Sequence, residues 1–329
     1  MNFTTAAAVW AAVTLSVAYL GERSGFGGWR FSLALGVAAA LFAFEFFLAA
    51  PRVQERIVTW FGNRGGMLAP LVPLFAVLIY CFSVTGDWAM LLAGAAYAVI
   101  PVLLLASSSG KSPGTWEDYA AIMALWLPAW LEPRYRLLYH IFPYPPPLTH
   151  TLAILMALGT GVAAFLLLRR LPGVGYAVEW RRGFTWNFAI NIIVFGAIAI
   201  PIGVKIGFLT WQPGLPHLRS VPLAGTGSFL LSAVGILLFT AWPEEFFFRG
   251  LLQNLLTKTL KSERAGLMAA SVIFGFAHIF HAPVPNWKYV LLATIAGIFY
   301  GRAWMKTGSL VPGTLVHGLV DIFWHLLFR

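Results

Sequence analysis

Long apolar blocks separated by short polar connections run through the whole chain. Most blocks are close to 20 residues long, and a helix of about 20 residues crosses roughly 30 Å of hydrocarbon. Backbone groups find no water partners in lipid, so a spanning segment has to be a helix or part of a closed barrel. The blocks show no period-2 alternation, which excludes a barrel. Eleven segments can be drawn, at residues 5–20, 31–50, 67–84, 88–106, 119–131, 150–168, 184–204, 228–242, 265–281, 287–304 and 309–328.

The fold predicted from this pattern is all-α, a polytopic transmembrane helical bundle of about 10–11 membrane segments. Segment 119–131 is short for a span and carries Pro128, so a re-entrant or interfacial helix is the alternative for it.

Composition agrees with a membrane location. Hydrophobic residues make up 59% of the chain and charged residues only 10%, whereas an ordinary soluble domain has about 25% charged residues. The formal net charge is +10, but no basic stripe interleaved with stacking aromatic residues is present. We therefore exclude nucleic acid as a partner and expect membrane lipids instead. The chain is predicted to be an integral, multi-pass membrane protein.

Lys and Arg residues concentrate in alternate connections between the segments. If all eleven segments cross, the connections on one side hold fourteen of the 22 Lys and Arg residues. Basic residues mark the cytoplasmic side, so the N-terminus is predicted to be cytoplasmic and the C-terminus outside. If segment 119–131 does not cross the membrane, the predicted orientation of the four segments before it is reversed.

Ionisable side chains inside a bilayer are costly and need an explanation. Four of the 12 acidic residues fall within or at the end of an apolar segment. Glu45 stands near the end of its segment, where its side chain can reach the interface. The other three lie in the last 90 residues together with two histidines; the five are Glu244, Glu245, His278, His317 and Asp321.

Helical spacing brings some of these groups together. Glu245 and Arg249 are four residues apart, so they are expected to form a structural ion pair. Glu244 lies about 100° further round the helix and has no such partner. His317 and Asp321 are also four apart, so Asp321 can accept a hydrogen bond from the imidazole. One unpaired carboxylate and two histidines suffice to bind or activate a water molecule.

The three motifs resemble those of a known family. EEFFFRG at 244–250, FGFAH at 274–278 and HGLVD at 317–321 look like the ordered motifs of the CAAX-protease and bacteriocin-processing (CPBP, Abi) family of intramembrane proteases. That pattern is a Glu-Glu pair followed by Arg, then Phe-x-x-x-His, then His-x-x-x-Asn/Asp. The resemblance covers about 225–329, which we predict to be a CPBP-like catalytic transmembrane core. Residues 1–220 are then an N-terminal transmembrane scaffold of unknown role.

The resemblance implies a catalytic set of Glu244, His278, His317 and Asp321. Glu244 would be the general base on water, aided by His278, while His317 and residue 321 would stabilise the oxyanion or hold a metal. Glu244, His278 and His317 are also a plausible Zn²⁺ ligand set, so a divalent metal, zinc first, is the expected cofactor. An ionised Asp321 cannot donate a hydrogen bond as the family's Asn does, so Asp321 is expected to orient His317 or to share a cation.

The predicted function is an intramembrane endopeptidase that cleaves near the membrane-embedded or lipidated end of a substrate protein. Its partners would be lipids and a protein or peptide with a membrane-associated segment. Two alternatives use the same residues: a proton or cation transporter, and a non-catalytic binding or immunity protein. A serine mechanism fits less well, because Ser309 is expected to be a helix N-cap.

Overall fold

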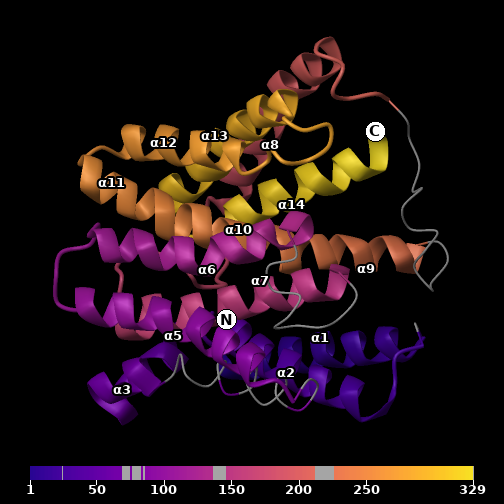
Figure 1. Ribbon diagram of the computed structural model, residues 1–329. Coiled ribbons are helices and arrows are strands. Elements are labelled where there is room, and N and C mark those ends of the chain that lie inside the picture. Colours follow the sequence, from indigo (N-terminus) through magenta and orange to yellow (C-terminus); the bar gives the residue numbers. More distant parts are fainter. Residues whose placement is uncertain are drawn as a thin grey trace. The chain divides into compact units, whose positions relative to one another are not determined.

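The computed structural model describes residues 1–23, 25–68, 75, 83, 86–135, 146–211 and 226–328. Those residues form helices, together with one isolated β-bridge between Trp211 and Phe328, and they hold no strand. The predicted all-α class is therefore confirmed (Figure 1).

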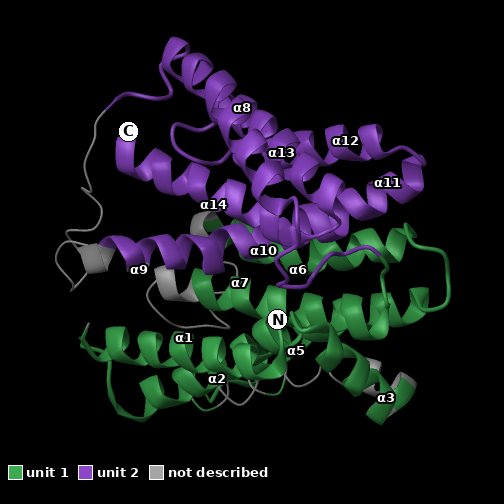
Figure 2. Cartoon of the chain, turned by 180° about the vertical axis from the view of Figure 1, so that it is seen from behind, with its two compact units in different colours: residues 1–172 green, residues 173–329 purple. Residues whose placement is uncertain are grey.

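The helices group into two compact units, Met1–Pro172 and Gly173–Arg329 (Figure 2). The boundary predicted between 220 and 225 marks where the family resemblance begins. By its contacts, the helix Phe184–Lys205 (α8) belongs with the C-terminal helices, since it packs on the helix Trp287–Thr307 and on the helix Leu310–Leu327, which carries the last motif.

The N-terminal unit is built around one long helical segment. This segment begins as α7 (Pro146–Ala163) and continues as a short π-helix, η1 (Ala164–Leu168). Its side chains from Ala153 to Leu155 are almost entirely buried, because other helices pack on several sides of it. Those helices are α2 (Gly28–Phe47), α3 (Pro51–Leu68), α5 (Trp88–Ser108) and α6 (Trp116–Tyr135), and α1 (Phe3–Arg23) packs on α2.

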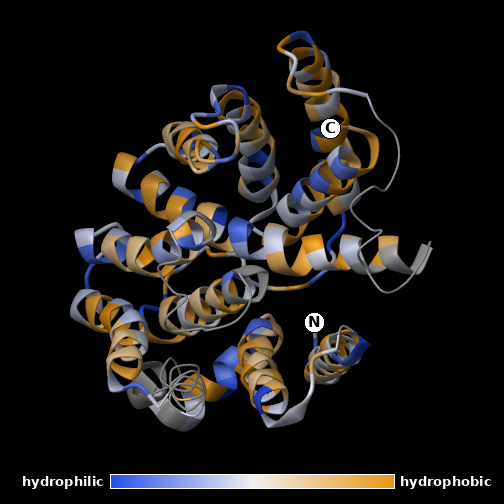
Figure 3. Cartoon of the chain, turned by 45° about the vertical axis from the view of Figure 1, so that its right-hand side comes forward, coloured by the Kyte–Doolittle hydropathy of each residue, from blue (hydrophilic) through white to orange (hydrophobic). Residues whose placement is uncertain are grey.

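Six of the described helical segments are long and apolar enough to cross a membrane, which supports an integral, multi-pass membrane protein. Apolar residues run along most helices in Figure 3. The predicted segment 119–131 forms α6, which is not among the six, and segment 67–84 lies almost wholly outside the described residues. The six are Phe3–Arg23, Gly28–Phe47, Trp88–Ser108, His150–Leu168, Phe184–Lys205 and Leu310–Leu327.

The C-terminal unit places α13 (Trp287–Thr307) between α8, α12 (Glu263–Phe276) and α14 (Leu310–Leu327). Before α12, one continuous helical segment runs from Thr226 to Leu260. Two π-helical stretches interrupt it on either side of the short helix α10. Its parts are α9 (Thr226–Ile236), η3 (Leu237–Ala241), α10 (Trp242–Glu245), η4 (Phe246–Gln253) and α11 (Asn254–Leu260).

Side chains define where the last three helices begin. Ser262, Asn286 and Ser309 each accept a hydrogen bond from a backbone N–H in the first turn of α12, α13 and α14. Such caps satisfy backbone donors that have no partner inside the helix. The N-cap role expected for Ser309 is therefore confirmed.

Candidate active site

The first motif lies where α10 passes into the π-helix η4. Glu245 and Arg249 are both completely buried, and Arg249 Nε lies 3.3 Å from Glu245 Oε2. The guanidinium also lies over the Phe274 ring, 4.7 Å from its centroid, where the negative face of the ring attracts a cation. Single π-helical turns within α-helices often occur at functional sites, and this one begins directly after the two glutamates.

His317, in the middle of α14, is surrounded by carboxylates. Its Nδ1–H donates to Glu245 Oε1 at 3.0 Å. On the other side of the ring, Nε2 lies 3.5 Å from Asp321 Oδ2 and 3.8 Å from Glu244 Oε2. The Tyr300 ring stacks on the imidazole, with 4.5 Å between centroids. One histidine thus joins the first motif to the third.

A glycine makes this approach possible. A Cβ atom on Gly313, one turn before His317, would lie 2.9 Å from Glu245 Oε2 and 3.2 Å from the Tyr300 carbonyl oxygen. A side chain there would require either the Glu245 carboxylate or α14 itself to shift.

His278 stands just beyond the end of α12. Segment 265–281 was expected to be one apolar helix, but α12 ends at Phe276. Residues 277–285, which include the sequence APVP at 282–285, form turns and bends instead. His278 Nδ1–H donates to the Phe274 carbonyl oxygen at 2.8 Å. This contact fixes the neutral ring tautomer in which Nε2 carries a lone pair.

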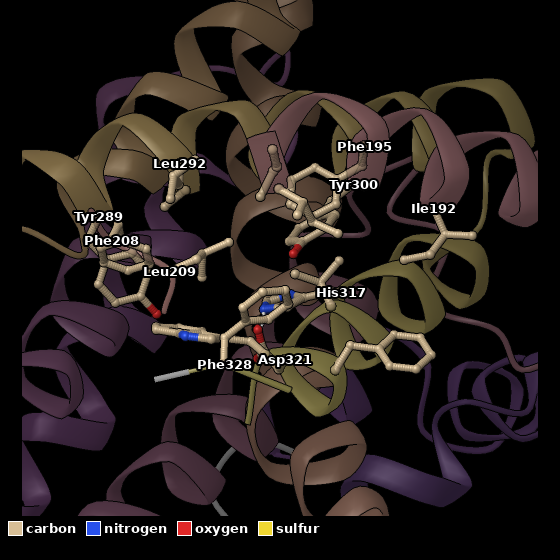
Figure 4. A pocket seen from close by; sticks show the side chains of 18 of the residues that line it. Ile192, Phe195, Phe208, Leu209, Tyr289, Leu292, Tyr300, His317, Asp321 and Phe328 are labelled. Carbon is tan, nitrogen blue, oxygen red and sulfur yellow. Dashed lines mark ion pairs between the residues drawn. The ribbon is translucent and has the colours of Figure 1, made fainter. Parts of the chain in front are cut away.

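An apolar cavity of about 370 Å³ lies beside these groups. His278, His317 and Asp321 contribute its polar wall, together with Tyr289 and Tyr300. Figure 4 shows His317 and Asp321 at one side of this cavity, with Phe208, Leu209 and Tyr289 on another. Apolar side chains form most of the remaining wall, among them Ile192, Phe195, Leu292, Ala296, Trp324 and Phe328.

The structure brings most of the predicted site residues close together, some by direct contact and others through a shared cavity. Glu244, Glu245, Arg249, His317 and Asp321 form one chain of contacts. His278 shares the cavity with His317 and Asp321, and the Phe274 ring contacts both histidine rings. Glu244 does not belong to the wall of this cavity and reaches it through His317.

No sequence motif predicts that Tyr289 and Tyr300 lie at the site. Both come from α13, which carries none of the three motifs. Tyr289 packs 4.5 Å from His278, measured between ring centroids. A tyrosine in an apolar helix looks like an ordinary packing residue, so only the fold could reveal these two.

Among the described residues, no group of three or more His, Cys, Asp or Glu side chains is arranged to hold a metal ion. The predicted ligands Glu244, His278 and His317 therefore do not form a ready ligand set here. The expectation of zinc stays a prediction.

The comparison with family models adds independent information. Residues 226–323 match the family model described as "Type II CAAX prenyl endopeptidase Rce1-like". Residues 226–323 are thus similar to this family, and we call them the Rce1-like segment. The Rce1-like segment contains all three motifs, so the resemblance drawn from them is confirmed. No curated protein and no solved structure matches the chain. At the level of the family, the match supports a CAAX-type intramembrane endopeptidase.

Proposed function

We propose that this protein is an intramembrane endopeptidase that hydrolyses a peptide bond near the membrane-embedded or lipidated end of a substrate protein. The family match supports the reaction class. One observation supports the site: three carboxylates surround His317 at the edge of an apolar cavity whose wall also holds His278.

In the proposed reaction, Glu244 and His278 activate a water molecule. His278 Nε2 bears a lone pair, because Nδ1–H is donated to Phe274, so this nitrogen can accept a hydrogen bond from water. The water oxygen attacks the scissile carbonyl carbon while its proton passes to the Glu244 carboxylate. The same proton then goes to the leaving amine as the peptide C–N bond breaks.

His317 is the proposed donor to the oxyanion. Its Nδ1–H is held by Glu245, and Asp321 and Glu244 face Nε2. A proton on Nε2 would therefore be stabilised by two nearby carboxylates and would be available to the developing negative charge. Arg249 forms an ion pair with Glu245, and Glu245 accepts the hydrogen bond from His317. The Glu245–Arg249 pair therefore affects catalysis by positioning His317.

The decisive experiment measures cleavage of a lipidated, membrane-anchored fluorogenic peptide by purified protein in proteoliposomes. We expect Glu244→Gln to remove turnover by about 10³-fold or more while leaving the folded yield unchanged. Glu263→Gln is the matched control, because Glu263 is exposed in the first turn of α12. Equal cleavage by the parent and Glu244→Gln would refute Glu244 as the base. Binding of the peptide without cleavage by the parent would support a non-catalytic binding protein, and proton flux without cleavage would support a transporter.

A further inference from the structure

The hydroxyl group of Tyr300 is a buried polar group that the reaction described above does not use. The side chain is only 2% exposed, and it lines the cavity together with His317 and Asp321. No hydrogen bond joins this hydroxyl to another residue in the part of the chain that the structure describes. A buried tyrosine O–H usually has a partner. Figure 4 shows the hydroxyl oxygen directed into the cavity, so its partner is a molecule that enters there.

Packing on several sides fixes the position of this hydroxyl. The Tyr300 ring stacks on the His317 imidazole, with 16° between the ring planes and 4.5 Å between the centroids. The rings of Phe274 and Phe195 lie 6.0 and 6.3 Å away, measured between centroids. The Arg249 guanidinium lies 5.9 Å from the centroid of the tyrosine ring. The O–H group is therefore held in place before any substrate arrives, as electrostatic catalysis requires.

The helix that carries Tyr300 is itself held close to its neighbours. A Cβ atom on Gly297 would lie 3.0 Å from the Cα atom of Ser271 in α12. A Cβ atom on Gly301 would overlap Gln253 Oε1 in η4. The two glycines lie on either side of Tyr300 in the sequence, so α13 is closely packed at this point. A functional group on such a rigid element is positioned more precisely than one on a loop.

The charges around His317 create a need for a further donor. Glu244, Glu245 and Asp321 all face this histidine, and an ionised carboxylate can only accept hydrogen bonds. Negative charge that develops on a carbonyl oxygen here would be opposed by them. His317 has a single N–H to offer, because its Nδ1–H is donated to Glu245. A phenol O–H is a neutral donor, so it can stabilise an oxyanion without adding to the negative charge.

Tyr289, the other tyrosine of the cavity wall, is placed differently. Its ring packs 4.5 Å from His278 and 5.1 Å from Trp324, measured between centroids. It therefore lies beside the histidine that is proposed to activate water. Donors to an oxyanion have to converge on one oxygen atom, so the tyrosine in contact with His317 is the better placed of the two.

We propose that Tyr300 is a catalytic residue whose hydroxyl donates a second hydrogen bond to the oxyanion, beside His317 Nε2. This inference rests on the proposed function. As the water oxygen bonds to the carbonyl carbon, the π electrons of the C=O bond move onto the carbonyl oxygen. Tyr300 and His317 donate to this oxygen and keep their protons. When the C=O bond re-forms, the C–N bond breaks and the amine leaves with the proton that Glu244 had taken from water.

The test compares the kinetics of Tyr300→Phe and the parent in the proteoliposome assay described above. Removing one oxyanion donor typically lowers kcat by about 10²-fold or more, and we expect a decrease of about 10²-fold with KM changed by less than about threefold. Phenylalanine keeps the ring that stacks on His317, so the thermal unfolding midpoint should equal or exceed that of the parent. Tyr19→Phe is the matched control, because Tyr19 is exposed in α1, and it should keep the parent's kcat.

A pair of inhibitors separates a catalytic role from a structural one. A phosphinate analogue of the same lipidated peptide carries a tetrahedral anion where the oxyanion forms. An N-methylated peptide keeps an uncharged amide at that place. Tyr300→Phe should weaken inhibition by the phosphinate by about the factor that it takes from kcat, and it should leave inhibition by the N-methylated peptide unchanged.

The outcomes distinguish this inference from the function on which it rests. No cleavage by the parent would refute the proposed function, and this inference with it. If the parent is active, three results would overturn the inference alone. The first is a kcat of Tyr300→Phe within about threefold of the parent's. The second is equal weakening of inhibition by the two inhibitors. The third is a loss of kcat in Tyr289→Phe as large as that in Tyr300→Phe.

Discussion

The buried pair of Glu245 and Arg249 offers a sharp test of how this site is held together. Arg249→Met keeps a long unbranched side chain but removes the charge. Both members of the pair are completely buried, and removing one partner of such a pair typically costs about 3–5 kcal/mol, because the other charge is left uncompensated. Glu245 would retain the hydrogen bond from His317, so we expect about 3 kcal/mol for the lost ion pair.

The lost cation–π contact adds to this cost. The guanidinium lies 4.7 Å from the Phe274 centroid, and a desolvated contact of this kind contributes about 1 kcal/mol or more. The total is therefore about 4 kcal/mol. Each kcal/mol lowers the unfolding midpoint by about 2–4 °C in a unit of this size, so we expect a decrease of roughly 8–16 °C.

Thermal unfolding in detergent, followed by fluorescence and by the amount of monodisperse protein, measures this decrease. Arg264→Met is the matched control, because Arg264 is exposed on α12, and it should change stability by less than about 0.5 kcal/mol. The double variant Glu245→Gln, Arg249→Met removes both charges and should recover at least half of the loss, since neutral replacement of a whole pair is often tolerated. A single variant within about 1 kcal/mol of the parent, or a double variant no more stable than the single one, would refute this account.

Three further predictions concern the site and the N-terminal unit. Asp321→Asn should reduce cleavage about tenfold or more, the effect seen when a partner of a functional histidine is lost; activity equal to the parent's would mean that residue 321 acts as a neutral donor. If zinc takes part, a chelator should abolish cleavage and added Zn²⁺ should restore it, with one equivalent found by elemental analysis; full activity at substoichiometric metal would exclude that role. In the N-terminal unit, burial raises the pKa of Asp118, but hydrogen bonds from Arg169 and from the Gly114 and Thr115 N–H groups outweigh it and leave this pKa below its usual value of 3.8. The stabilisation by the ionised Asp118 carboxylate is then complete above pH 3.8 and is lost as the pH falls through the lower pKa that Asp118 has in the folded state. Below pH 3.8, the thermal unfolding midpoint of the parent should therefore fall more steeply with pH than that of Asp118→Asn.

The sequence was informative where partners lie within one helical turn. Glu245 and Arg249 are four residues apart, and so are His317 and Asp321, so helical geometry alone predicted that each pair would meet. The bond from His317 to Glu245 was not predictable in this way, because 72 residues separate the two. It depends on how α14 approaches α10, and hence on the missing side chain of Gly313.

The apolar segments predicted the positions of the helices more accurately than they predicted the helix ends. The segment expected at 287–304 became α13, Trp287–Thr307, and its end agrees with the αL conformation of Gly308. The segment expected at 265–281 stopped at Phe276 instead. Hydropathy cannot detect this end, since IFH continues the apolar run, and the prolines at 283 and 285 lie too far along the chain to place the end at Phe276.

The early end of α12 has a chemical consequence at His278. The last carbonyl groups of a helix lack partners within it, and the imidazole Nδ1–H satisfies one of them at Phe274. The same bond that completes the helix end therefore selects the tautomer with a basic Nε2. At His317 the equivalent nitrogen is instead held by a buried carboxylate, Glu245. The two histidines of this cavity therefore differ in the partner of Nδ1, a backbone carbonyl at His278 and a carboxylate at His317. The proposed reaction uses this difference, with His278 accepting a hydrogen bond from water and His317 donating one to the oxyanion.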